Sequence, residues 1–195
     1  MVNRRTWILL GAIALFCAAF LLLNFHAAVS NTQADMDKIT TTSGDRLPDA
    51  MQRQDKIRIA LVGEGPLGRA LQESLVAEMQ KAGIGEIELV EALETGDQNP
   101  VLVVKVDPTN ILWTPFFGTS HFRIEAGYAS NGDTTFMDGM GSVYNSEDGP
   151  ALHMSADYEI SDRSWGLISL PGYHQLLAEY LAKQITAAVK DLYAV

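Results

Sequence analysis

An apolar block close to the N-terminus constrains the fold of this chain more than any other feature. Residues 7–25 contain no charged side chain, and residues 7–23 contain no polar one. A helix rises about 1.5 Å per residue, so a block of this length approaches the ~30 Å thickness of the hydrocarbon core of a bilayer. The block and its basic leader therefore predict a transmembrane signal-anchor over residues 1–25.

A cleavable signal peptide is the alternative interpretation of the same block. The basic leader, and the small residues Ala28 and Ser30 on either side of Val29, are typical of a signal peptide and its cleavage site. Signal peptides, however, usually have apolar stretches of only about 7 to 15 residues. We therefore expect the segment to be retained, with cleavage as the alternative.

The basic residues around the block predict its orientation. Arg4 and Arg5 precede it, and the next Lys or Arg after it is Lys38. Because basic flanks stay in the cytoplasm, we expect a single-pass cell-membrane protein with a cytoplasmic N-terminus and its C-terminal domain outside. Cleavage of the N-terminal segment would instead give a secreted protein.

Two further regions follow the block. Residues 26–55 are rich in Ser, Thr, Asn and acidic residues and contain few large apolar ones, so we expect a polar, flexible tether. Residues 56–195 have the length of one ordinary domain. They are expected to fold as a single extracytoplasmic domain.

The apolar pattern of this domain predicts an α+β fold. Residues 57–61 alternate as a strand does, and the three-to-four spacing over residues 67–79 and 173–192 predicts two helices, the second capped by Ser169. We predict a two-layer sandwich of a mainly antiparallel sheet with the two helices on one face. The other strands are expected over residues 86–90, 101–106, 111–113, 122–128, 134–137 and 152–160, with a hairpin turn at residues 131–132.

Charge excludes one class of partner. The net charge is −10, and from residue 31 onward twelve Lys and Arg stand against 24 Asp and Glu. Such a domain repels phosphates, so nucleic-acid binding is not expected. No Lys or Arg lies between Arg123 and Arg163, an interval that contains eight acids. We interpret it as a solvated face, with a divalent cation or a basic partner as the alternative.

A glycine motif joins the first predicted strand to the first predicted helix. Gly63, Gly65 and Gly68 form a G-x-G-x-x-G that resembles the dinucleotide fingerprint of nicotinamide enzymes over about 35 residues. The strand before a fingerprint is normally buried on both faces, whereas Lys56 and Arg58 predict a strand covered on one face only. We therefore expect no cofactor and assign the glycines to a tight turn.

Other motifs for catalysis or metal binding are not found in the sequence. The four His residues lack the H-E-x-x-H spacing, and the single Cys excludes a Cys-based zinc site. Ser120 and His121 are neighbours, which point to opposite sides of a strand. We predict no catalytic residue and no metal ligand.

An unusual concentration of aromatic residues supplies the candidate binding residues. Trp113, Phe116 and Phe117 lie in a connection punctuated by Pro and Gly, and Trp165 could join them. An exposed apolar patch usually marks an interaction site. The alternative is that these rings cover the sheet edge or pack beneath a helix.

These observations indicate a membrane-tethered envelope domain with a non-catalytic binding or scaffolding role. The expected partners are the membrane, through residues 7–25, and another envelope protein. A dinucleotide-binding module that uses the glycine turn is one alternative function. An envelope hydrolase whose site is assembled only by the tertiary structure is another.

Overall fold

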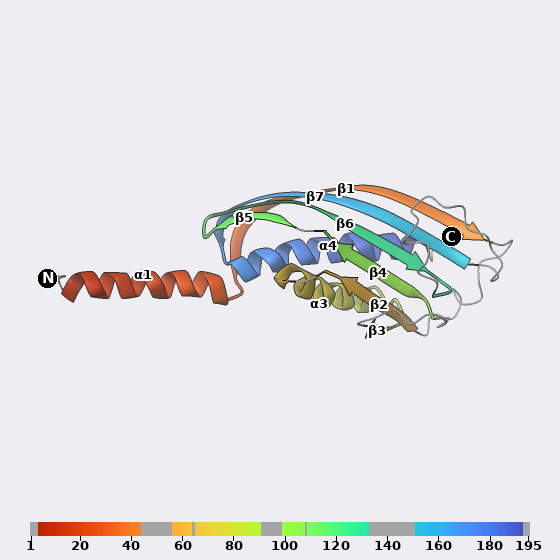
Figure 1. Cartoon of the computed structure of the whole chain (residues 1–195), viewed down its shortest axis with the longest axis horizontal. Coiled ribbons are helices and arrows are strands. Elements are labelled where there is room, and N and C mark those ends of the chain that lie inside the picture. The colour runs from red at the N-terminus through yellow and green to blue at the C-terminus, as the bar shows by residue number, and fades with distance from the viewer. Residues whose placement is uncertain are drawn as a thin grey trace.

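A computed structural model describes residues 4–43, 56–63, 65–90, 99–107, 109–132 and 151–192. Within these ranges the chain forms three helices and one seven-stranded mixed sheet (Figure 1), so the α+β class is confirmed. In chain order the elements are α1 (Arg4–Leu22), β1 (His26–Ser43), β2 (Lys56–Val62), α3 (Pro66–Lys81), β3 (Glu86–Val90), β4 (Val101–Val106), β5 (Asn110–Thr114), β6 (Phe117–Ala129), β7 (Ala151–Ile168) and α4 (Leu170–Leu192).

The sheet combines antiparallel and parallel pairing. Its strand order is β1-β7-β6-β4-β2-β3, with β5 paired to β6 beside this path. β2 is parallel to both β3 and β4, and every other pairing is antiparallel. The α3 crossover joins two parallel neighbours, as crossovers of this kind do. Helices α3 and α4 lie on one face of the sheet, which we call its inner face (Figure 1).

The core lies between the inner face and the two helices. Alternate residues of the strands meet the apolar stripes of α3 and α4, and Tyr128, Tyr158 and Tyr173 are among its largest fully buried side chains. The expected Ser169 cap of α4 is confirmed. Gly83 follows α3 at a φ of 73°, and the Ser169 hydroxyl accepts the amide of Gly172 at 3.0 Å at the start of α4.

The expectation that β2 is covered on one face only is wrong. Arg58 and Ala60, which point to the outer face, are each only 4% exposed. Ala60 packs in a small outer cluster with Val101, Val103 and Ala129. Lys56 of β2 pairs with Glu88 of β3, with its Nζ 3.0 Å from the carboxylate Oε2.

The prediction of a flexible tether is wrong for residues 26–43. They form β1, which pairs with β7 over its whole length, from His26 opposite Ile168 to Ser43 opposite Ala151. This edge strand is half-buried at four of the small or hydroxylated positions that suggested a tether: Ala28, Ser30, Thr32 and Ala34. The remainder of the expected tether, residues 44–55, lies outside the described residues.

The antiparallel strands are longer than their patterns predict. β6 begins at Phe117 and β7 continues to Ile168, so Phe117 and Trp165 lie within strands, and the expected aromatic connection is reduced to a turn at Pro115 and Phe116. Gly132 has a φ of 76°, as a turn after β6 requires. The return strand expected over residues 134–137 lies outside the described residues.

The N-terminal helix stands apart from the sheet and its two covering helices. Figure 1 shows α1 projecting from one end of the body. Its large apolar side chains are mostly exposed, from Trp7 at 64% to Leu22 at 78%, whereas Phe20 at its base is buried. Of the helices in the described residues, none has the combined length and apolarity needed to cross a membrane. The transmembrane helix predicted for residues 7–25 is therefore not supported.

Candidate functional site

The aromatic candidates lie at the end of the sheet from which α1 projects. β5 and β6 form a hairpin with Pro115 and Phe116 as its two-residue turn. The tip of this hairpin is fastened to the last residues of β7. The Gly166 amide donates to the Phe116 carbonyl at 3.1 Å, and the Ile168 amide donates to the Pro115 carbonyl at 3.1 Å.

The structure brings three of the four aromatic candidates together. Phe117 lies opposite Trp165 in the β6–β7 register, and their ring centroids are 4.4 Å apart. Trp165 is 64% exposed, and Phe116 in the adjoining turn is 60% exposed. Trp113 does not join them, because it packs half-buried against the core and its indole Nε1 donates to the Ile168 carbonyl at 3.1 Å.

Three aliphatic residues that the sequence interpretation missed extend this surface. Val29 of β1 lies opposite Trp165 and is 81% exposed, while Leu112 and Leu167 are also exposed. Leu167 could have been found by continuing the alternation of β7 past Trp165. Val29 could not, because its strand was interpreted as a tether. We call the combined surface the aromatic end: Val29, Leu112, Phe116, Phe117, Trp165 and Leu167.

A buried polar cluster lies on the inner face of the sheet at the same end. Its centre is Asp162 of β7, whose carboxylate is buried and accepts hydrogen bonds from four hydroxyls. Ser30 and Thr32 of β1 donate to Oδ1 at 2.6 and 2.8 Å. Ser164 and Tyr173 donate to Oδ2 at 2.9 and 2.7 Å. The cluster therefore ties β1, β7 and α4 together beneath the aromatic end.

Burial affects the Tyr173 hydroxyl of this cluster. Desolvation raises the pKa of Tyr173 well above its usual value, and the hydrogen bond to Asp162 acts in the same direction. The hydroxyl is thereby held in its protonated form. It remains a donor to the Asp162 carboxylate, as the short distance requires.

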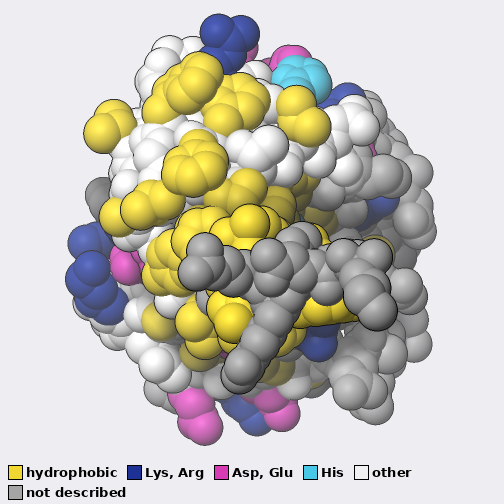
Figure 2. Space-filling view, turned by 90° about the vertical axis from the view of Figure 1, so that its left-hand side faces the viewer, with side chains coloured by type: hydrophobic (Ala, Val, Ile, Leu, Met, Phe, Trp, Pro, Cys, Tyr) yellow, Lys and Arg dark blue, Asp and Glu magenta, His cyan; other side chains and the backbone are white. Residues whose placement is uncertain are grey.

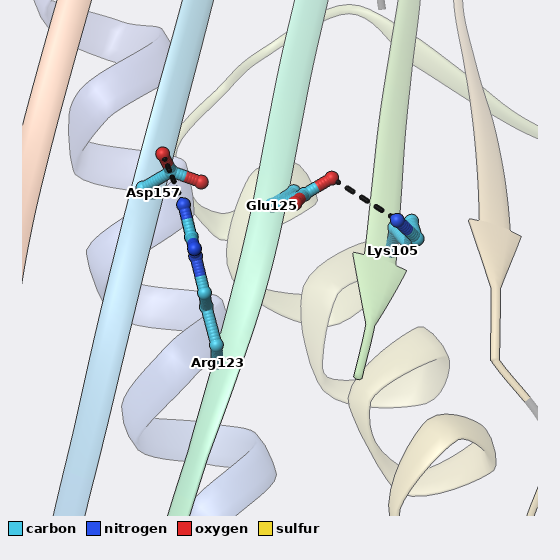
Figure 3. Close-up of polar contacts among 4 residues, drawn as sticks. All are labelled: Lys105, Arg123, Glu125 and Asp157. Atoms are coloured by element: carbon cyan, nitrogen blue, oxygen red, sulfur yellow. Dashed lines mark hydrogen bonds and ion pairs between the residues drawn. The ribbon is translucent and has the colours of Figure 1, made fainter. Parts of the chain in front are cut away.

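Farther along the same strands the outer face is charged. Lys105 of β4 lies 3.3 Å from Glu125 of β6, and Arg123 of β6 lies 2.8 Å from Asp157 of β7 (Figure 3). The two ion pairs therefore connect three neighbouring strands. The hydrogen bond to Asp157 raises the pKa of Arg123. We call this region the charged middle: Asp35, Asp37, Lys105, His121, Arg123, Glu125, Asp157 and Glu159. The part of the expected acidic face in residues 133–150 lies outside the described residues.

The charged middle and the aromatic end differ in which face of the sheet carries the polar side chains. In the charged middle, Asp157 and Glu159 point outward while Tyr158 and Ile160 are buried in the core. At the aromatic end, Trp165 points outward while its polar neighbour Ser164 is buried. Strand alternation is preserved throughout, but beyond the exposed Arg163 the outer positions are apolar, while the inner positions include the polar Asp162 cluster.

The point at which α1 leaves the body is held by hydrogen bonds. The Ser169 hydroxyl accepts from the Phe25 amide at 2.9 Å and donates to the Phe25 carbonyl at 2.8 Å. The Ser169 amide donates to the same carbonyl at 3.0 Å. Viewed from this end, hydrophobic side chains gather around α1 and beside it (Figure 2). The aromatic end and α1 thus form neighbouring apolar surfaces.

The glycine turn lies beside a small cavity. Gly65 has a φ of 104°, and a Cβ on Gly68 would lie 2.9 Å from the Gly63 carbonyl oxygen, so the fold itself accounts for these glycines. The cavity has a volume of about 290 Å³. Its described lining contains Asp107 and His174 but no Lys or Arg, and burial lowers the pKa of His174.

The other candidate chemistry is not assembled by the described residues. Ser120 is buried whereas His121 is exposed, as their adjacency in a strand predicts. Within the parts of the chain that the structure describes, no group of three or more His, Cys, Asp or Glu could hold a metal ion.

Comparisons with known proteins add little. The sequence matches no protein-family model and no curated protein. Structural similarity is found to PelC dodecamers from Paraburkholderia phytofirmans, at 12% identity and a TM-score of 0.41 over 75% of this chain and 94% of that one in the form with space group P6. A minor lipoprotein from Acinetobacter baumannii is similar at 15% identity and a TM-score of 0.31, over 70% of this chain and 92% of that one. At such low TM-scores these similarities support no conclusion about this chain.

Proposed function

We propose that this protein is an envelope domain attached to a membrane through its N-terminal helix, with a non-catalytic binding or scaffolding role. The observation that carries the proposal is the pair of exposed apolar surfaces at one end of the molecule. Helix α1 exposes apolar side chains along most of its length, and the aromatic end lies beside its base. Surfaces of this kind are usually covered by a membrane or a partner.

The exposure of α1 supports attachment to a membrane. A helix that is apolar on all sides is normally surrounded by protein or by lipid. Contacts with the body bury only its base, around Phe20. Lipid provides the remaining apolar surroundings without requiring a further protein.

The orientation follows from the charges on either side of the helix. Arg4 and Arg5 lie in its first turn, and the body that follows it is strongly acidic. Basic residues remain on the cytoplasmic side. In this proposal the N-terminus is cytoplasmic and the domain from β1 onward faces the extracytoplasmic side, where Phe116, Phe117 and Trp165 contribute to contact and Trp113 supports them from the core.

The proposal is tested by fractionating cells that express the full chain with a C-terminal epitope tag. We expect the tag in the membrane fraction, resistant to carbonate washing, and digested by protease added outside the cytoplasmic membrane. The matched variant is Leu9→Lys with Ile13→Lys, which places two charges on the exposed side chains of α1 and should release the chain from the membrane. A tag recovered only from the cytosol, or protected from external protease, contradicts the proposal.

A further inference from the structure

We infer that the aromatic end rests on the lipid bilayer, at the boundary between head groups and acyl chains, next to the point where α1 enters it. The inference rests on the proposed attachment through α1. It goes further by naming the bilayer surface as the partner of Phe116, Phe117 and Trp165. The body would then be held against the membrane in one orientation instead of moving freely on its anchor.

The reversed polarity of the sheet end is the first reason. A sheet end facing water places polar residues outward and apolar residues inward. Here Ser30, Thr32 and Ser164 point inward and satisfy the Asp162 carboxylate. On the outer face Asn31, Thr119 and Arg163 are polar, but the next register position is apolar in all three strands, with Val29, Phe117 and Trp165. Three neighbouring strands thus end in apolar outer side chains, an arrangement consistent with an outer face that meets an apolar medium.

Continuity with α1 is the second reason and selects lipid as the occupant. Val29 follows Leu22, the last residue of α1, by only seven residues. The hydrogen bonds between Ser169 and Phe25 fix that connection to the start of α4. When α1 inserts in a bilayer, the aromatic end is therefore carried to the surface of the same bilayer.

The arrangement of side chains and charges is the third reason. Trp and Phe are favoured at membrane interfaces, where an amphipathic surface sinks about 5–10 Å into the head-group boundary. The acids of the charged middle start at Asp35, six residues beyond Val29, which is about 20 Å along an extended strand. That separation exceeds the Debye length of about 8 Å at physiological salt, so anionic head groups repel these acids only weakly.

The test uses tryptophan quenching in the full chain reconstituted into vesicles of phosphatidylcholine with brominated acyl chains. The chain has three tryptophans, Trp7, Trp113 and Trp165. Replacing two of them by Phe gives one variant that retains only Trp165 and another that retains only Trp7. Circular dichroism shows whether Trp113→Phe disturbs folding. If it does, Trp113 is kept in both chains of a pair, one with Trp165 and one with Trp165→Phe. The emission of Trp165 is then the difference between the emissions of these two chains.

Two results would support the inference. Emission from Trp165 should fall roughly twofold relative to unbrominated vesicles, because the aromatic end sits about 5–10 Å into the boundary. Bromines near the glycerol end of the chain should quench it more than bromines near the methyl end. Phe116→Asp should reduce this quenching, whereas quenching of Trp7 should be unchanged.

The contradictory outcomes are distinguishable. Quenching of Trp7 without quenching of Trp165 overturns the inference while membrane attachment stands. If neither tryptophan is quenched, the proposed attachment fails as well. Blue-shifted Trp165 emission that is not quenched and depends on protein concentration would show that a second copy of the chain covers the aromatic end, which also overturns the inference.

Discussion

The aromatic end and the charged middle share strands β1, β6 and β7, yet they present opposite surfaces. In the middle, β6 and β7 carry the Arg123–Asp157 ion pair outside and apolar side chains inside, and β1 carries acids outside. At the end nearest α1, the same strands carry apolar side chains outside and a hydroxyl–carboxylate cluster inside. The difference indicates that buried apolar area stabilises the charged middle. The aromatic end is stabilised by buried polar contacts and by surroundings outside the domain.

The largest effect should come from removing the carboxylate beneath the aromatic end. Asp162→Ala leaves four buried or half-buried hydroxyls without their acceptor, and we expect the free energy of unfolding to fall by about 3 kcal/mol or more. Glu159→Ala, at an exposed contact with His121 in the charged middle, should cost less than about 1 kcal/mol. Urea denaturation of both variants measures the difference, and equal losses would contradict the comparison.

The next effect separates the two tryptophans of the site. Trp113→Ala removes a ring packed on the core and its hydrogen bond to Ile168, and should cost about 2 to 3 kcal/mol. Trp165→Ala should cost about 1 kcal/mol or less, because its ring is exposed and packs mainly on Phe117. The same denaturation experiment decides. A loss of several kcal/mol at Trp165 would make the aromatic end part of the core.

Two buried tyrosines provide a smaller and closely matched test. Tyr173→Phe loses a hydrogen bond to a carboxylate and should cost about 1.5 to 3 kcal/mol. Tyr158 lies beneath the charged middle, and its hydroxyl has no hydrogen-bond partner in the described part of the chain. Burial raises the pKa of Tyr158 to about 12. Tyr158→Phe should therefore change stability by less than about 0.5 kcal/mol, or increase it slightly. A larger loss at Tyr158 than at Tyr173 would reverse the expected contrast.

The smallest expected effect is a pH dependence at the base of α1. Burial lowers the pKa of His174, so the unfolded chain takes up this proton more readily than the folded one. Stability should fall as the pH drops below about 6.5, the ordinary histidine value, and the loss should stop below the folded pKa. His174→Gln should remove this part of the pH profile and match the unmodified chain at pH 8. If the stability of the His174→Gln chain changes between pH 7 and pH 5 as much as that of the unmodified chain, the prediction is contradicted.

Regular periodicity made part of the fold predictable. The β2–α3–β3 unit and α4, with its Ser169 cap, follow from apolar spacing and from Gly and Ser at helix ends, which are local signals. β1 was not predicted because its inner positions carry the polar residues Ser30 and Thr32. These residues are accommodated by hydrogen bonds to Asp162, which lies far away in the sequence.

The candidate site was predictable only in part, for a related reason. The aromatic residues were evident from composition, but the hairpin places Trp113 on the core side and Phe117 beside Trp165, a division that depends on strand register. Val29 joins them only through the pairing of β1 with β7. Local pattern cannot reveal a surface that non-local pairing assembles.

The most direct test of the central claim compares two positions on the outer face of β1. Val29→Cys lies in the aromatic end and Asp37→Cys in the charged middle, each in a full chain whose native cysteine is replaced by Cys17→Ala. Both chains are reconstituted into phosphatidylcholine vesicles and treated with a membrane-impermeant maleimide. The account predicts rapid labelling at position 37 and protection at position 29. Equal labelling rates at the two positions would contradict it.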